Sequence, residues 1–199
     1  MVRLSIDGKQ IEAEEGTSIL NAAQNAGIEI PALCSHKLLR PYGACRVCLV
    51  EIKRDGSEAR KIVASCTHPV ENNSIIYTNS ERVIKTRKIV IGFLLARAPD
   101  SDIIKNLAQR YGVAEGSSDK IGLYLFKRAS KSPPGKCILC GLCVRVCDEV
   151  VGMKAIGFTC RGKKRKVQTP FNKISETCIG CGACAYICPT KGIDIKEAA

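Results

Sequence analysis

The stretch CILCGLCVRVC, from Cys137 to Cys147, places four cysteines at gaps of two, two and three residues. Nearly the same phrase returns as CIGCGACAYICP, from Cys178 to Pro189, and a looser group of cysteines lies earlier in the chain. Three sets of four cysteines result: Cys34, Cys45, Cys48 and Cys66; Cys137, Cys140, Cys143 and Cys147; Cys178, Cys181, Cys184 and Cys188. The spacing within these three sets is the strongest indication in the sequence of its fold and of the groups that it binds.

The composition of the 199 residues, 45% hydrophobic and 25% charged, is typical of one or two globular domains. The longest uninterrupted apolar run, residues 89–96, is much shorter than the roughly 20 residues that span a bilayer. The polar sequence after Met1 lacks a signal-peptide core, so we expect a cytoplasmic protein. Cytosolic thiols stay reduced and 13 cysteines is an odd number, which favours metal binding over disulfides.

The two late runs have the spacing of bacterial two-cluster ferredoxins, in which the fourth cysteine of each run ligates the other cluster. The sequence therefore predicts two [4Fe-4S] clusters. One is assigned to Cys137, Cys140, Cys143 and Cys188, and the other to Cys178, Cys181, Cys184 and Cys147. Gly141, Gly180 and Gly182 permit the positive φ that tight wrapping around a cluster requires. Zinc is a weaker alternative, because a tetrahedral ion needs two cysteine pairs set apart by a loop.

The first group, Cys34-x10-Cys45-x2-Cys48-x17-Cys66, is a lengthened relative of the plant-type arrangement for a [2Fe-2S] cluster. The surrounding pattern predicts a hairpin over residues 1–14 with a turn at Asp7-Gly8, and a helix capped by Thr17 or Ser18. Strands are expected at residues 48–53, 60–65 and 74–78. This is the element order of a β-grasp ferredoxin, although a zinc site with the same cysteines remains open.

Helices without cluster ligands are expected between the two cysteine-rich parts. Ser80 can cap a helix over residues 81–95, Pro99 ends it, and Ser101 or Asp100 can cap a second helix. The predicted fold class is α+β. The domains are a β-grasp [2Fe-2S] domain (residues 1–79), a helical connector (80–128) and a bacterial-type 2[4Fe-4S] ferredoxin domain (129–199).

This order of modules, with the phrases PYGACRVCLVEI, CILCGLCVRVCDEV and IGFTCRGKKRKVQTPF, resembles the N-terminal iron-sulfur region of the large electron-input subunit of complex I NADH dehydrogenase. The same region occurs in iron-only hydrogenases and as the small diaphorase-type subunit of NAD-reducing hydrogenases. The resemblance implies an electron-transfer subunit within a hetero-oligomer. Its implied partners are a flavin-containing NAD(P)H-oxidising subunit and a catalytic subunit, such as a hydrogenase, a formate dehydrogenase or a tungsten or molybdenum enzyme.

One departure from that family concerns the connector. The family's mixed cluster site of one histidine and three cysteines has no counterpart in LLARAPDSDIIKNLAQRYGV, residues 94–113. Electron exchange between the first cluster and the other two would then require close packing of the connector, or a bridging partner. We find no Gly-rich dinucleotide fingerprint and no hydrogen-activating or molybdopterin-type domain, so no catalytic site is evident.

The net charge of +12 is less unusual once three clusters of about −2 each, by formal charge counting, are included. The basic run at residues 163–166 has no interleaved aromatics, which favours a solvated hairpin tip over a nucleic-acid patch. Cys160 is expected to be a small strand residue, and His36 and His68 polar loop residues, not ligands. Two alternatives stay open: a free soluble polyferredoxin carrier and, more remotely, a zinc-binding nucleic-acid module.

Overall fold

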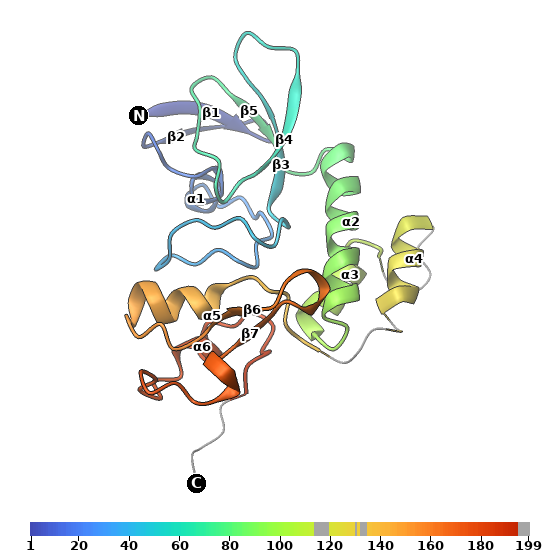
Figure 1. Ribbon diagram of the computed structural model, residues 1–199. Helices are drawn as coiled ribbons and strands as arrows, with labels where there is room; N and C mark the ends of the chain where they lie inside the picture. The colour runs from blue at the N-terminus through green and yellow to red at the C-terminus, as the bar shows by residue number, and fades with distance from the viewer. Residues whose placement is uncertain (114–119, 130, 132–134, 195–199) are drawn as a thin grey trace.

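The computed structural model describes residues 1–113, 120–129, 131 and 135–194. A mixed sheet with one helix forms the N-terminal part, a small domain of short helices and a hairpin forms the C-terminal part, and longer helices stand beside both (Figure 1). Within the described residues, no helix is long and apolar enough to cross a membrane.

The N-terminal part is a five-stranded sheet with the order β2-β1-β5-β3-β4. Its strands are β1 (Val2–Ile6), β2 (Lys9–Ala13), β3 (Leu49–Lys53), β4 (Arg60–Ala64) and β5 (Ile75–Tyr77). The expected hairpin is confirmed, with Leu4 opposite Ile11 and positive φ at Asp7 and Gly8. Strands β1 and β5 run parallel, and the other pairs are antiparallel. Helix α1 (Ile19–Asn25) begins after Ser18, whose side chain accepts the Asn21 amide and caps it as expected.

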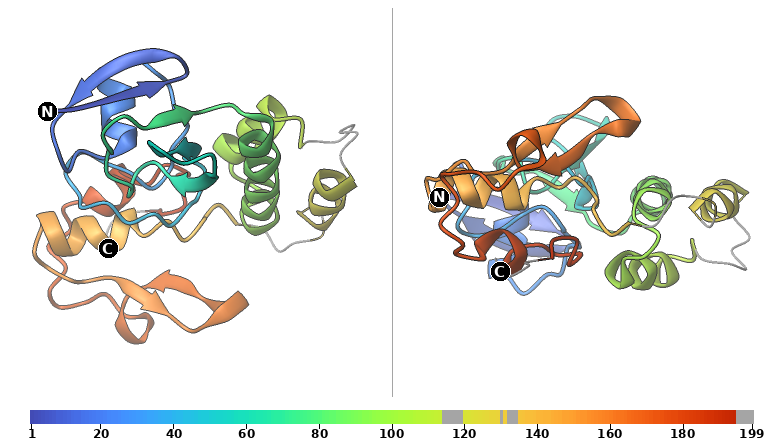
Figure 2. Two further views of the ribbon diagram at one scale, coloured as in Figure 1. Left: turned by 90° about the horizontal axis from the view of Figure 1, so that it is seen from above. Right: turned by 60° about the horizontal axis from the view of Figure 1, so that its bottom comes forward.

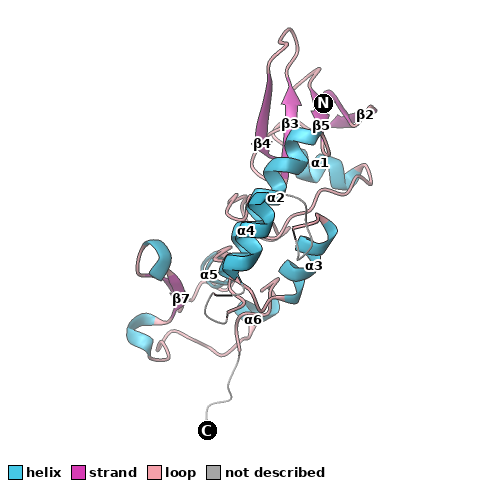
Figure 3. Cartoon of the chain, turned by 90° about the vertical axis from the view of Figure 1, so that its right-hand side faces the viewer, coloured by secondary structure: helices cyan, strands magenta, loops and turns pink. Residues whose placement is uncertain are grey.

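Two helices follow, as the sequence predicts. Helix α2 (Glu81–Arg97) begins after Ser80, and α3 (Asp102–Arg110) begins after Ser101, whose hydroxyl accepts the Ile104 amide. Ser101 therefore caps α3, and the alternative, Asp100, was wrong. A further helix, α4 (Lys120–Ala129), was not predicted and packs along α2 (Figure 3). The lack of a side chain at Gly92 permits this close approach, because a Cβ there would lie 2.5 Å from a methyl carbon of Leu125.

The C-terminal part is built around two short helical segments. Helix α5 (Leu142–Arg145) continues into a π-helical turn, η1 (Val146–Val150), and contacts α6 (Ala183–Tyr186). Between them, β6 (Gly157–Thr159) and β7 (Lys166–Gln168) form a projecting hairpin with 3₁₀ turns at η2 (Gly162–Lys164) and η3 (Pro170–Asn172) (Figure 2). The basic run thus lies at a hairpin tip, as expected.

The expectation for Cys160 was wrong in one respect. Cys160 lies just beyond the end of β6, exposed and at φ +59°, where the chain starts to turn toward η2. The strand is shorter than the pattern suggested because the hairpin turn begins here. Cys160 is therefore a turn residue.

Two apolar cores hold the molecule together. One lies between the sheet and α1, with Leu4, Ile6, Leu20 and Ile76 at 1% exposure or less. The other joins all three parts of the chain, because it combines Ile91 of α2 with residues of the first and last cysteine groups. This shared core packs the N-terminal part against the C-terminal part.

Candidate metal centres

The first cysteine group forms one compact site, here called site 1, made of Cys34, Cys45, Cys48 and Cys66. All four side chains are buried, at 1 to 3% exposure. Cys34 and Cys45 lie on the long loop after α1, Cys48 directly precedes β3, and Cys66 follows β4. The thiols contact one another, and the Cys45 amide donates to the Cys34 sulfur over 3.3 Å.

Contacts among these thiols favour thiolates at two of them. Hydrogen bonds from the thiols of Cys45 and Cys66 lower the pKa of Cys34 to about 2, and a hydrogen bond from Cys66 lowers the pKa of Cys48 to about 6. The same contacts raise the pKa of Cys45 and of Cys66. Because the thiolate is the metal-binding form of cysteine, site 1 has the character of a ligand set.

The second site, site A, draws on both late runs. Cys137, Cys140 and Cys143 line one cavity of about 130 Å³ together with Cys188, which follows α6. The Leu139 amide donates to the Cys137 sulfur over 3.4 Å, and the Gly192 amide donates to the Cys188 sulfur over 3.3 Å. Such amides stabilise negative charge on sulfur.

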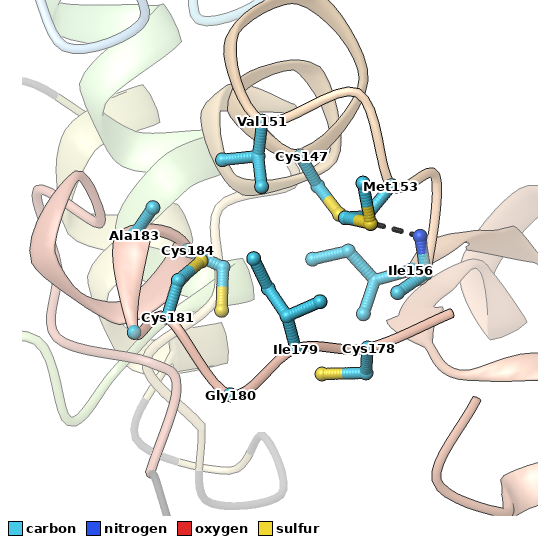
Figure 4. A pocket seen from close by; sticks show the side chains of 12 residues that line it. Cys147, Val151, Met153, Ile156, Cys178, Ile179, Gly180, Cys181, Ala183 and Cys184 are labelled. Atoms are coloured by element: carbon cyan, nitrogen blue, oxygen red, sulfur yellow. Dashed lines mark hydrogen bonds between the residues drawn. The ribbon is translucent and has the colours of Figure 1, made fainter. Parts of the chain in front are cut away.

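The third site, site B, is the complement of site A. Cys178, Cys181 and Cys184 line a cavity of about 120 Å³ with Cys147 of η1 (Figure 4). The Ala155 amide donates to the Cys147 sulfur over 3.2 Å. Gly180 and Gly182 adopt positive φ, as Gly141 does in the earlier run, so all three glycines wrap the chain as expected. The fourth cysteine of each run thus faces the cavity of the other run.

The size of the two cavities fits a multi-atom cluster. Each exceeds several-fold the roughly 10–15 Å³ that a cavity needs to hold one water molecule. Four thiolates about 2.3 Å from a single zinc ion would draw together and leave no such space. Among the described residues, no group of three or more His, Cys, Asp or Glu side chains is placed to hold a single metal ion. Donor chemistry and cavity size therefore favour iron-sulfur clusters at sites A and B.

Sites A and B differ in electrostatic surroundings. The cavity at site A is lined by Arg97 and Lys166 as well as by cysteines, whereas the residues that line site B include no charged side chain. Burial raises the pKa of Cys140 to about 11 and of Cys143 to about 12. Cations near a redox centre favour its more negative, reduced form.

Site 1 and site A lie against each other. The loop of residues 33–47, here called the docking loop, packs Cys34, Leu39 and Val47 into the apolar core that also holds Cys140 and Ile138. Negative charge on Cys34 even contributes, after burial and the neighbouring cysteines, to the raised pKa of Cys140. The connector, without a ligand of its own, closes this core from the side with Ile91 and Leu95.

Polar contacts fasten the docking loop to α5 and η1. The Arg40 amide donates to Glu149 Oε2 over 3.0 Å, and the Arg145 guanidinium donates to the Arg40 carbonyl. Arg145 also pairs with Glu149 over 2.8 Å and lies 5.2 Å from the centre of the Tyr42 ring. The Tyr42 ring in turn lies close to Gly141, where a Cβ would lie 3.2 Å from a ring carbon.

Comparison with protein families agrees with this geometry. Residues 1–81 match a 2Fe-2S iron-sulfur cluster binding domain, and residues 136–192 match a 4Fe-4S dicluster domain. The chain is a two-domain iron-sulfur protein. Its α+β fold, with the 2Fe-2S domain at the N-terminus and the dicluster domain at the C-terminus, is the one expected.

The iron-sulfur protein is homologous to subunits of large oxidoreductases, which confirms the resemblance in the sequence. It is 33% identical to the NADH-ubiquinone oxidoreductase 75 kDa subunit of Reclinomonas americana, over 98% of its own length and 30% of that protein. It is 30% identical to NADP-reducing hydrogenase subunit HndD of Solidesulfovibrio fructosivorans, over 96% of its own length and 35% of that protein. The chain thus spans about a third of the length of these two relatives.

A solved structure shares the fold. A chain of an NAD+-reducing [NiFe]-hydrogenase in the H2-reduced state superposes with a TM-score of 0.75, at 24% identity. The match covers 96% of the iron-sulfur protein and 86% of that chain. The joint arrangement of sheet, connector and dicluster domain therefore occurs in a second protein.

Several polar residues near the sites have modest roles. His36 accepts the Leu38 amide over 3.3 Å, and His68 contacts the Pro69 carbonyl and Glu71. Both are loop residues, as expected. The sequence analysis missed Arg87, the largest fully buried side chain of the protein's described part. Helical spacing could have marked Arg87, because it lies four residues from both Val83 and Ile91, on the buried face of α2.

Proposed function

We propose that the iron-sulfur protein relays single electrons inside a multi-subunit oxidoreductase. It would hold one [2Fe-2S] cluster at site 1 and one [4Fe-4S] cluster at each of sites A and B, and these clusters supply reversible one-electron chemistry. The observation that carries the proposal is the direct packing of Cys34 against the core that holds Cys140. With the two ligand sets in one apolar core, no additional centre is needed between them.

The protein's own residues provide the insulation and the orientation that a relay requires. Val47, Ile91 and Ile104 are 0% exposed and exclude water from the junction between site 1 and site A. The docking loop is fixed to α5 through Arg145 and to η1 through Glu149, which holds the two sites at a set separation. A short, dry and rigid junction is what packing can contribute to electron exchange.

The ligand assignment and the domain limits belong to the same proposal. The first domain limit is supported by the last strand of the sheet, β5, which ends before Ser80, the residue that caps α2. We propose residues 1–79, 80–128 and 129–199 as β-grasp domain, connector and ferredoxin domain. Supporting the assignment, each run's fourth cysteine lines the other run's cavity.

A hetero-oligomer fits the surface better than a free carrier does. Large apolar side chains of the C-terminal domain are strongly exposed, with Phe171 at 91%, Ile174 at 77%, Ile179 at 64% and Tyr186 at 92%. Ile179 lines site B itself. Exposed apolar surface around a functional site is typical of contact with a partner. We propose a flavin-containing NAD(P)H-oxidising subunit and a catalytic oxidoreductase subunit as partners, in the cytoplasm.

Iron counting in paired variants tests the ligand assignment. The protein purified without oxygen should hold about ten iron atoms with matching sulfide, from the cluster formulae. Cys188→Ser and Cys137→Ser share site A, so the double variant should lose about four iron atoms. Cys188→Ser with Cys184→Ser should lose about eight, because these cysteines belong to different sites. The opposite pattern would mean that each run binds its own cluster.

Purification from the native cells tests the relay itself. The protein should be recovered without oxygen together with a flavoprotein, and the complex should reduce the clusters when NADH or NADPH is added. Electron paramagnetic resonance would report that reduction. Recovery of a brown protein alone, with clusters that NAD(P)H leaves oxidised in the cell extract, would favour the free carrier and contradict the proposal.

A further inference from the structure

Arg87 links the connector to the loop that carries site 1. It lies on α2 and is 0% exposed. Its guanidinium reaches into the β-grasp domain, where Nε donates to the Val47 carbonyl over 3.0 Å and Nη2 donates to the Leu49 carbonyl over 2.6 Å. Val47 and Leu49 flank Cys48, so Arg87 fixes the backbone on both sides of a site 1 cysteine.

The remaining donors of Arg87 are also satisfied. Nη2 donates to the Thr78 carbonyl over 3.0 Å, and Nη1 donates to Asn79 Oδ1 over 3.3 Å and to the Tyr111 hydroxyl over 3.1 Å. A guanidinium carries five N–H groups, and all five have acceptors. Every one of these acceptors is neutral.

The charge of Arg87 therefore lacks a carboxylate partner within the described residues 1–113, 120–129, 131 and 135–194. The buried carboxylate on β3, Glu51, is paired instead with Arg60 and Arg82. Burying an arginine against neutral groups alone is costly. An anionic centre close by would offset that cost. Site 1 is the candidate, because Arg87 binds the carbonyls on both sides of Cys48 and four thiolates around a [2Fe-2S] cluster carry net negative charge.

We propose that Arg87 is the charge partner of site 1 and sets its reduction potential. This inference rests on the proposed [2Fe-2S] assignment. A buried cation favours the state with one more negative charge, so it raises the potential of the centre beside it. Because Arg87 is sealed from solvent, salt screens its effect weakly. Arg87 is thus a positioning residue that ties the connector helix to the electronic properties of the first centre.

The matched variants are Arg87→Gln, Arg87→Lys and, as a control, Lys85→Gln. Gln removes the charge, Lys keeps the charge but not the five-donor geometry, and the Lys85 variant removes one charge from the exposed face of the same helix. The readout is an anaerobic redox titration that follows the [2Fe-2S] electron paramagnetic resonance signal and the [4Fe-4S] signals separately.

We expect Arg87→Gln to shift the [2Fe-2S] potential to a more negative value than wild type, with smaller shifts of the [4Fe-4S] potentials. Arg87→Lys should recover most of the shift, and Lys85→Gln should leave the potential near that of wild type. An unchanged [2Fe-2S] potential in Arg87→Gln, or a shift equal to that of Lys85→Gln, overturns the inference.

If Arg87→Gln fails to hold its [2Fe-2S] cluster, its potential cannot be measured, and cluster retention is compared between the two Arg87 variants instead. Retention of the cluster by Arg87→Lys then supports the charge role, whereas loss in both variants leaves Arg87 as a purely structural residue and overturns it. If wild type itself shows no [2Fe-2S] signal, the proposed function fails first. If wild type shows the signal and only the predicted shift is missing, the ligand assignment stands and the role of Arg87 fails alone.

Discussion

Replacing Gly141 with alanine should loosen the junction between the two cluster domains. Gly141 adopts φ +79° at the start of α5 and lines site A. A Cβ on this residue would lie 3.2 Å from a ring carbon of Tyr42 on the docking loop and 3.3 Å from the ring of Phe158 on β6. To accept the methyl group, the two rings would have to move by a few tenths of an ångström where three segments meet beside site A.

The cost has two parts. An L-residue in the left-handed region costs about 1–2 kcal/mol, and overpacking two aromatic rings adds about 1–3 kcal/mol. Gly180 isolates the first part, since it has φ +68° in the other run and nothing within 4 Å of its Cβ position. The difference between Gly141→Ala and Gly180→Ala is thus about 2 kcal/mol, which corresponds to roughly thirtyfold in an equilibrium or rate constant.

The assay is the rate of cluster loss in guanidinium chloride without oxygen, followed by visible absorbance. Hydrogen exchange of the docking loop is measured in parallel. We expect faster bleaching in Gly141→Ala than in Gly180→Ala, and faster exchange of the docking loop in Gly141→Ala alone. Adding Tyr42→Ala should recover part of the Gly141→Ala loss by removing one of the two rings. Equal bleaching rates in the two glycine variants would refute the reasoning from contacts.

Three further outcomes are expected. Arg97→Gln should lower the potential of one [4Fe-4S] centre, at site A, in a redox titration, and equal shifts at both centres would contradict the contrast between the two cavities. Treatment with an iron chelator and ferricyanide should remove about four iron atoms from site B first. Cys178 and Cys181 at site B are exposed, whereas the site 1 cysteines are buried. Early loss of the [2Fe-2S] signal would speak against this order. Gly92→Ala should speed hydrogen exchange in α4, because the new methyl group would collide with Leu125. Adding Leu125→Ala to that variant should slow the exchange again. Unchanged exchange in Gly92→Ala would show that α4 tolerates the extra methyl group.

Local signals made much of this fold predictable. The alternation in β1 and β2, the hydroxyls of Ser18, Ser80 and Ser101, and the spacing of the cysteines all act over a few residues. Capping and pleating depend on neighbours in the chain, so they can be read from one sequence. The position of each run's fourth cysteine at the other run's cavity could also be expected, because the spacing implies it.

Contacts between distant parts of the chain could not be predicted from the sequence. Helical spacing places Arg87 on the same face of α2 as the buried Val83 and Ile91, unlike the exposed Lys85. The carbonyls of Val47 and Leu49 that accept its hydrogen bonds, however, come from a distant part of the chain and cannot be read from the helix. The apolar residues of the docking loop show no regular spacing in the sequence, yet they form one side of the junction between site 1 and site A. The packing of α4 depends on Gly92 of α2. Glycine has a low helix propensity, so its local effect is to weaken α2, but its lack of a side chain leaves room for Leu125 of α4.

The interleaving of the late cysteines also orders the synthesis of the protein. The four cysteines of site 1 have all been synthesised by residue 66, well before those of the late runs. Cys188 follows its companions at site A by more than forty positions, and site B combines Cys147 with Cys184. Neither late centre can be closed until nearly the whole second domain has emerged. Until then, the apolar side of the docking loop lacks the residues of the C-terminal domain that bury it in the folded protein.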